Sequence, residues 1–222
     1  MEVISKIQED ILQKFCLSPD SKQFYLTGGT ALAHFYLKHR KSRDLDFFTP
    51  EAGILLPYSR EFQASLVDRG YSVEQYRRLN SAVDLIVSRG QESTMVQFAQ
   101  DARLRLEATK EFANYPGLRV DNLRDIAANK LLALFGRALP RDFVDVYYLV
   151  REAGFKKEEM MELAKKKDPG FDLYWLGVAF DRAKAVNESA PDTLLLLRPP
   201  DMKELQDFFV SWRAAIAAQL SP

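Results

Sequence analysis

A glycine pair at the end of a short apolar segment, followed by two alternating aspartates, restricts the fold of this chain most. The first segment, Phe24-Tyr25-Leu26-Thr27-Gly28-Gly29-Thr30, predicts a strand that turns directly into a helix. The second, Ser42-Arg43-Asp44-Leu45-Asp46-Phe47-Phe48, predicts a strand on which both carboxylates project from one face. A glycine turn at a helix start presents backbone N–H groups to a phosphate, and paired carboxylates are best tolerated around a divalent cation. Together they indicate phosphoryl or nucleotidyl transfer.

The overall composition sets bounds on this interpretation. A chain of 222 residues with 47% hydrophobic content can bury a sizeable core in one domain or two small ones. Lys+Arg and Asp+Glu both total 31, so any nucleic-acid contact has to come from a local patch. A single cysteine, Cys16, indicates a reducing compartment, and the N-terminus has no signal-peptide core. We therefore expect a cytoplasmic protein without a membrane-spanning segment.

The periodicity of apolar residues predicts an α+β fold. In the first part it favours a small mixed, largely antiparallel sheet, with helices at residues 4–15, 30–38 and 58–69 and strands at residues 24–27, 44–48, 71–78, 82–88 and 94–99. Beyond residue 121 the pattern is helical, with helices expected at residues 121–137, from Pro140 onward, and at residues 157–166, 171–186 and 201–220. Breaks are expected at Pro191 and Pro199-Pro200. We assign residues 1–115 to an α/β core and residues 116–222 to a helical region packed against it.

Two motif groups resemble the AbiEii/AbiGii toxin family of the nucleotidyltransferase superfamily. The first comprises Leu26-Thr27-Gly28-Gly29-Thr30-Ala31-Leu32-Ala33 and the Asp-x-Asp strand. The second, Asp125-Ile126-Ala127-Ala128-Asn129-Lys130 with Arg141-Asp142-Phe143-Val144-Asp145, is similar to that family's Lys-then-Arg-Asp-x-x-Asp region. Both groups occur in the family's order, within residues 20–150.

The resemblance implies a magnesium- or manganese-dependent nucleotidyltransferase with a nucleoside triphosphate as substrate. Asp44 and Asp46 are expected to bind the metal, and the expected catalytic residues are Asp44, Asp46, Lys130 and Asp142. The expected nucleotide-binding residues are Gly28, Gly29, Thr30, Ser42, Arg43 and Lys130. The acceptor is expected to be RNA, particularly tRNA, or protein, and a cognate antitoxin is the expected partner.

Lys130 supports this interpretation without the family. It lies three and four residues after Ala127 and Ile126, on the apolar stripe of its own helix, where a lysine must either snorkel or meet an anion. A boundary lysine with its stem in the core is the simpler explanation. Asp142 and Asp145 also have simpler, structural explanations, because Asp142 can complement a helix dipole and Asp145 can pair with Arg141.

Other charged residues carry less weight. Arg40 and Arg43 are candidates for contacting nucleotide or RNA. His34 resembles a helix-surface residue, and nothing near His39 in the sequence has metal-ligand spacing.

The third carboxylate that nucleotidyltransferases often take from a later strand is missing at its expected place. The strand Met95-Val96-Gln97-Phe98-Ala99 has Gln97 there, and an amide cannot act as a base near neutral pH. Asp84 on the neighbouring strand is one substitute and Asp101 a weaker one. Alternatively, the proton passes to Asp46 or water, or turnover is weak. Two other functions stay open: transfer to a small molecule such as an aminoglycoside, and a degenerate fold that only binds a nucleotide or a partner.

Overall fold

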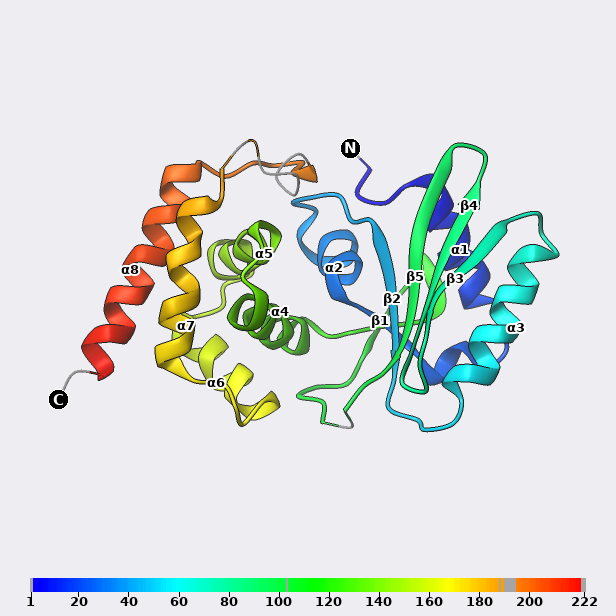
Figure 1. The fold of residues 1–222 in the computed structure, drawn as a ribbon, viewed down its shortest axis with the longest axis horizontal. Helices are drawn as coiled ribbons and strands as arrows, with labels where there is room; N and C mark the ends of the chain where they lie inside the picture. Colours follow the sequence, from blue (N-terminus) through cyan, green and yellow to red (C-terminus); the bar gives the residue numbers. More distant parts are fainter. Residues whose placement is uncertain (1, 103, 188, 190–194, 221–222) are drawn as a thin grey trace. The chain divides into compact units, whose positions relative to one another are not determined.

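The computed structural model describes residues 2–102, 104–187, 189 and 195–220 (Figure 1). Pro191, a predicted break, lies outside the described residues. The chain forms two compact units, each of which is described by itself. The sheet unit comprises Met1–Tyr36 and Lys41–Asn122, and the helical unit comprises Leu37–Arg40 and Leu123–Pro222.

The sheet unit is built on a seven-stranded mixed sheet with the order β3-β4-β5-β2-β1-β7-β6. The strands are β1 (Tyr25–Thr27), β2 (Asp44–Thr49), β3 (Ser72–Arg78), β4 (Ala82–Arg89), β5 (Glu92–Gln100), β6 (Lys110–Phe112) and β7 (Tyr115–Val120). Neighbouring strands are antiparallel except for the pairs β2/β5 and β1/β7, which are parallel. The predicted fold class is confirmed, down to the mixed and mainly antiparallel character of the sheet.

One face of this sheet is the core of the unit. Helices α1 (Lys6–Cys16) and α3 (Leu55–Val67) lie on the same side of β3, β4 and β5 (Figure 1). Phe15 of α1 stacks on Phe47 of β2 with ring centroids 3.9 Å apart, and Phe98 of β5 stacks on Phe47 in turn. Because side chains alternate along a strand, Asp44 and Asp46 project from the opposite, half-buried face.

Some boundaries differ from the sequence-based expectations. Strands β6 and β7 were not expected. Strand β6 has only three residues, and Pro116 and Gly117 interrupt the alternation of β7. Helix α3 begins at Leu55, earlier than expected, since Pro57 is accepted in its first turn. The predicted helix 30–38 is a short α-turn, α2 (Gly28–Thr30), that continues as a π-helix, Ala31–Leu37.

The helical unit contains α4 (Leu123–Arg137), α5 (Pro140–Arg151), α6 (Lys157–Lys167), α7 (Leu173–Phe180), a 3-10 turn (Asp181–Ala185) and α8 (Met202–Leu220). The predicted helix 171–186 is thus divided into α7 and the 3-10 turn. The core of the helical unit includes the rings of Phe143, Phe180, Phe209 and Trp212, which form a chain of ring contacts. In the part of the chain that the structure describes, no helix combines the length and hydropathy needed to cross a membrane.

Candidate nucleotidyltransferase site and a buried ion cluster

The glycine turn and the second aspartate are packed directly against each other. Gly28 has a left-handed φ of 71°, and a Cβ added there would lie 2.1 Å from Oδ2 of Asp46. The register explains the contact, because Thr27 is paired with Asp46 and Gly28 is the next residue. Only glycine gives both the backbone conformation and the space for this carboxylate.

The rest of the predicted nucleotide-binding residues surround this contact. Gly29 and Thr30 complete the turn of α2, and the Thr30 hydroxyl donates to the backbone carbonyl of Asp44. Ser42 and Arg43 precede β2, so Ser42 does not share the strand alternation. The backbone amide of Ser42 donates to the Val3 carbonyl at 3.1 Å. Ser42 is buried, whereas Arg43 is exposed.

The acid pair fits a magnesium ion that is bound together with a triphosphate. Asp44 and Asp46 offer oxygen ligands from one face of β2, and both are half-buried, so the face stays accessible. Among the described residues, no three His, Cys, Asp or Glu side chains are grouped as a metal site. Magnesium commonly binds through one or two carboxylates and completes its shell with substrate phosphates and water, so a pair is sufficient.

Gln97 and Asp84 extend from Asp46 as one row across the sheet. Asp46 is paired with Gln97 across β2 and β5, and Gln97 is paired with Asp84 across β5 and β4. Gln97 Nε2 donates to Asp84 Oδ1 at 2.9 Å, and Arg77 Nε lies 2.7 Å from Asp84 Oδ2. Asp101, the weaker substitute, follows β5 and accepts a hydrogen bond from the Tyr25 hydroxyl, whose pKa is raised by burial and by that carboxylate.

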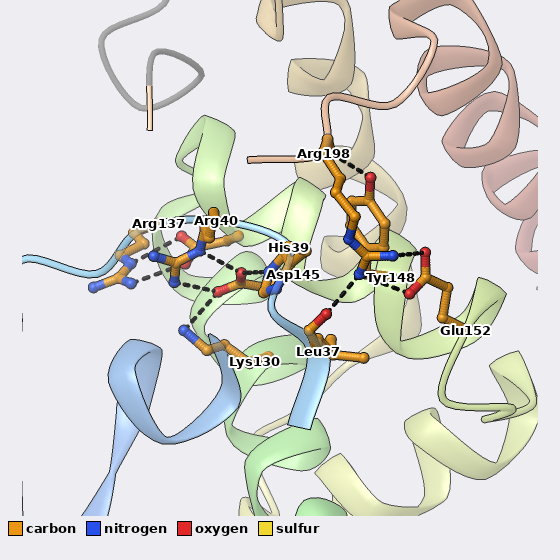
Figure 2. A network of polar contacts seen from close by, with 10 residues as sticks. Leu37, His39, Arg40, Lys130, Arg137, Asp145, Tyr148, Glu152 and Arg198 are labelled. Carbon is orange, nitrogen blue, oxygen red and sulfur yellow. Dashed lines mark hydrogen bonds and ion pairs between the residues drawn. The ribbon is translucent and has the colours of Figure 1, made fainter. Parts of the chain in front are cut away.

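In the helical unit, three basic side chains converge on Asp145 (Figure 2). Lys130 Nζ lies 2.7 Å from Oδ2, and Arg40 contacts both oxygens, with Nε 2.7 Å from Oδ1 and Nη2 2.9 Å from Oδ2. His39 Nε2 lies 2.7 Å from Oδ1. The side chain of Asp145 is 0% exposed and that of Lys130 is 8% exposed, so this is a buried ion cluster.

The charges of the cluster shift the pKa values of its members. Burial acts to raise the pKa of Asp145, but Arg40 and Lys130 outweigh it and hold this pKa well below its usual range. Burial lowers the pKa of His39 and outweighs the opposing effect of Asp145, and the neighbouring cations Arg40 and Lys130 add to the lowering. The neutral His39 ring donates through Nε2 to Asp145, while its buried Nδ1 has no hydrogen-bond partner among the described residues.

Asp142 is paired with Arg137 near the start of α5. Arg137 binds its two carboxylate oxygens at 2.9 and 2.8 Å, and the Leu139 amide donates to Oδ2 at 3.1 Å. Asp142 therefore contributes to the start of α5, because its carboxylate accepts a hydrogen bond from the backbone N–H of Leu139, the N-cap residue.

The segment Leu37–Arg40 is held in the helical unit by backbone contacts. The amides of Leu197 and Arg198 donate to the His39 carbonyl at 3.0 and 3.1 Å. Arg198 also donates to the Leu37 carbonyl and pairs with Glu152, as Figure 2 shows. Sequence reasoning gave His39 little weight, since neither helical periodicity nor motif spacing relates residue 39 to residue 145.

Comparisons with known proteins agree with this architecture. The sequence profile described as "Nucleotidyl transferase AbiEii toxin, Type IV TA system" matches residues 10–220. An uncharacterized protein of Aquifex aeolicus (strain VF5) is 30% identical over 176 residues, which is 78% of this chain and 80% of that protein. The chain belongs to the AbiEii family of nucleotidyltransferase toxins of type IV toxin–antitoxin systems.

Two solved structures share the fold. JHP933 from Helicobacter pylori has a TM-score of 0.57 at 20% identity, covering 97% of this chain and 90% of that one. MenT4, a nucleotidyltransferase toxin from Mycobacterium tuberculosis, has a TM-score of 0.56 at 19% identity, covering 97% of this chain and 83% of that one.

Proposed function

We propose that the protein transfers a nucleoside monophosphate from a nucleoside triphosphate to a hydroxyl group of RNA, with tRNA as the favoured acceptor. The packing of Asp46 onto the Gly28 turn carries this proposal, because it places a carboxylate beside the start of a helix whose N–H groups suit phosphate. The acceptor oxygen bonds to the α-phosphorus, the bond from that phosphorus to pyrophosphate breaks, and the hydroxyl proton is released.

The residues of the sheet unit divide this task. Asp44 and Asp46 would hold magnesium or manganese, which supplies charge neutralisation and orientation of the phosphates when bound. Gly28, Gly29 and Thr30 would seat the phosphates through the helix start, and Ser42 and Arg43 would contact the nucleotide from the approach to β2. This assignment uses the half-buried face on which both carboxylates project.

Two residues of the helical unit complete the proposed catalytic set. Lys130 would stabilise charge that grows on the leaving pyrophosphate, and Asp142 would act in catalysis. Membership of a nucleotidyltransferase family supports these roles, and in the structure Lys130 is ion-paired with Asp145.

The family also points to a partner and a setting. Toxins of type IV systems imply a cognate antitoxin, which we propose as the protein partner of this chain in the cytoplasm. The composition agrees with a compartment that keeps thiols reduced, since Cys16 is the single cysteine and is unpaired.

Calorimetry tests the metal and nucleotide assignment. The wild type should bind Mg²⁺ weakly alone and more tightly with one of the four nucleoside triphosphates, and Asp44→Asn/Asp46→Asn should lose that gain. Asp68→Asn, at an exposed position after α3, is the matched control. Equal binding by the wild type and the double variant refutes the metal assignment, and no binding of any nucleotide by the wild type favours a degenerate fold.

Labelling tests the acceptor. The wild type is incubated with α-labelled nucleoside triphosphates and total RNA, purified tRNA, a protein extract or an aminoglycoside. Label in tRNA is the expected result. Label on the aminoglycoside alone would contradict the proposed acceptor while leaving nucleotidyl transfer intact.

A further inference from the structure

A polar row crosses four neighbouring strands of the sheet unit and ends at the acid pair. Arg77 of β3 is paired with Asp84 of β4, Asp84 with Gln97 of β5, and Gln97 with Asp46 of β2. Residues that are paired in register project from the same face, so these four side chains lie side by side. The row therefore places the Gln97 amide where the resemblance to nucleotidyltransferases leads one to expect a carboxylate.

The chemistry of Asp84 determines how the Gln97 amide is oriented. Arg77 contacts both Asp84 oxygens, with Nη2 3.1 Å from Oδ1 and Nε 2.7 Å from Oδ2. A carboxylate in such an ion pair only accepts hydrogen bonds, so Gln97 must offer it the NH₂ group. With its NH₂ group donated to Asp84, the planar amide keeps its carbonyl oxygen off that carboxylate, where it can accept a hydrogen bond from another group.

Asp84 itself is poorly placed to act as the third acid. Two strand spacings separate its backbone from that of Asp46, which amounts to about 10 Å. Asp84 is 5% exposed, and its oxygens are occupied by Arg77 and Gln97. Gln97, in contrast, is half-buried and directly beside Asp46.

We propose that Gln97 Oε1 accepts a hydrogen bond from the attacking hydroxyl of the acceptor, with Arg77 and Asp84 as positioning residues that fix the amide. This inference rests on the proposed nucleotidyl transfer. The hydroxyl oxygen bonds to the α-phosphorus, pyrophosphate leaves with the electrons of the broken P–O bond, and the proton passes to water. Gln97 orients the hydroxyl but takes no proton, because an amide oxygen is not basic near neutral pH.

Nuclear magnetic resonance tests the amide orientation without any substrate. The ¹⁵N-labelled side-chain amide of Gln97 is identified by its loss in Gln97→Glu. Its protons should exchange slowly with solvent in the wild type, and Asp84→Asn should shift the resonances and speed the exchange. Asp68→Asn should leave them unchanged. Unchanged resonances and exchange in Asp84→Asn would overturn the positioning role.

Kinetics tests the contact with the acceptor. With the acceptor found by labelling, Gln97→Ala and Asp84→Asn should each slow transfer about tenfold, the scale of one neutral hydrogen bond. The double variant should be no slower than Gln97→Ala, since Asp84 acts through the amide. In Gln97→Ala and Asp84→Asn, the affinity for Mg²⁺ with triphosphate should stay unchanged. Asp84→Glu should be faster than Asp84→Asn, because it keeps the carboxylate. Thermal melting checks that each variant is folded.

Two results would overturn this role. Further slowing by Asp84→Asn in the Gln97→Ala background would show that Asp84 acts by itself. Weaker binding of Mg²⁺ with triphosphate in Gln97→Ala would place the amide oxygen on the metal instead. A wild type that labels no acceptor would overturn the proposed function and the hydroxyl contact together, whereas the amide orientation would still be decided by the resonance experiment.

Discussion

Replacing Asp145 by asparagine should strongly destabilise the helical unit. The side chain is 0% exposed and neutralises the buried cations of Arg40 and Lys130. Asparagine keeps the shape but removes the negative charge that both cations contact, and breaking a buried pair in this way costs about 3–5 kcal/mol. Glu204→Gln is the matched control, because the exposed pair of Glu204 with Arg151 is worth about 0–1 kcal/mol.

Urea unfolding followed by tryptophan fluorescence measures this difference. Both tryptophans, Trp175 and Trp212, lie in the helical unit, and Trp212 is buried, so the signal reports on the unfolding of that unit. With an m-value of about 2 kcal/mol/M, the Asp145→Asn midpoint should fall by about 2 M, whereas Glu204→Gln should move it by less than about 0.5 M.

A second substitution tests the reason for the loss. Adding Lys130→Met to Asp145→Asn removes one uncompensated cation, so the double variant should be more stable than Asp145→Asn alone. Equal midpoints for Asp145→Asn and Glu204→Gln would refute the claim that the cluster is a buried and charge-compensated structure.

Three further predictions concern the site and the cluster. Gly28→Ala should weaken Mg²⁺-dependent nucleotide binding at least about tenfold by displacing Asp46, and the left-handed φ should cost about 1–2 kcal/mol of stability; unchanged calorimetry would contradict this. Lys130→Ala should lower turnover about 10²-fold, Lys130→Arg should recover part of it, and Asp142→Asn should impair activity. Full activity in both Lys130→Ala and Asp142→Asn would confine catalysis to the sheet unit, whereas a lower melting temperature alone would reflect the lost ion pairs with Asp145 and Arg137. The pKa of His39 is lowered on folding, so below about pH 6.5 the unfolded state binds more protons than the folded state. The free energy of unfolding should therefore decrease as the pH is lowered through this range. In His39→Gln, urea unfolding at several pH values should show a smaller change of this free energy with pH.

The local parts of the site could be predicted because their signals are local. Gly28 was predicted to make a turn before a helix, and Asp44 and Asp46 were predicted to share a face of a strand, which follows from the period of two. The fold class followed from the same periodicities. Strand β7 was missed because Pro116 and Gly117 remove the alternation that identifies a strand.

The partners of Lys130 show where this reasoning ends. Its position on an apolar stripe predicted that the ammonium must snorkel or meet an anion, and the structure shows that it meets Asp145. The involvement of His39 and Arg40 had no sequence signal, because they are more than one hundred residues away from Asp145 in the chain.

The sequence by itself determined the glycine turn, the alternating acids and the helical periodicity, since each depends on backbone geometry over a few residues. Only the tertiary structure decided that Gln97 lies between Asp46 and Asp84, because strand register is set by pairing across the whole sheet. It also decided that Asp145 is shared by a lysine, an arginine and a histidine, since these side chains come from segments that are distant in the chain and meet only in the folded protein.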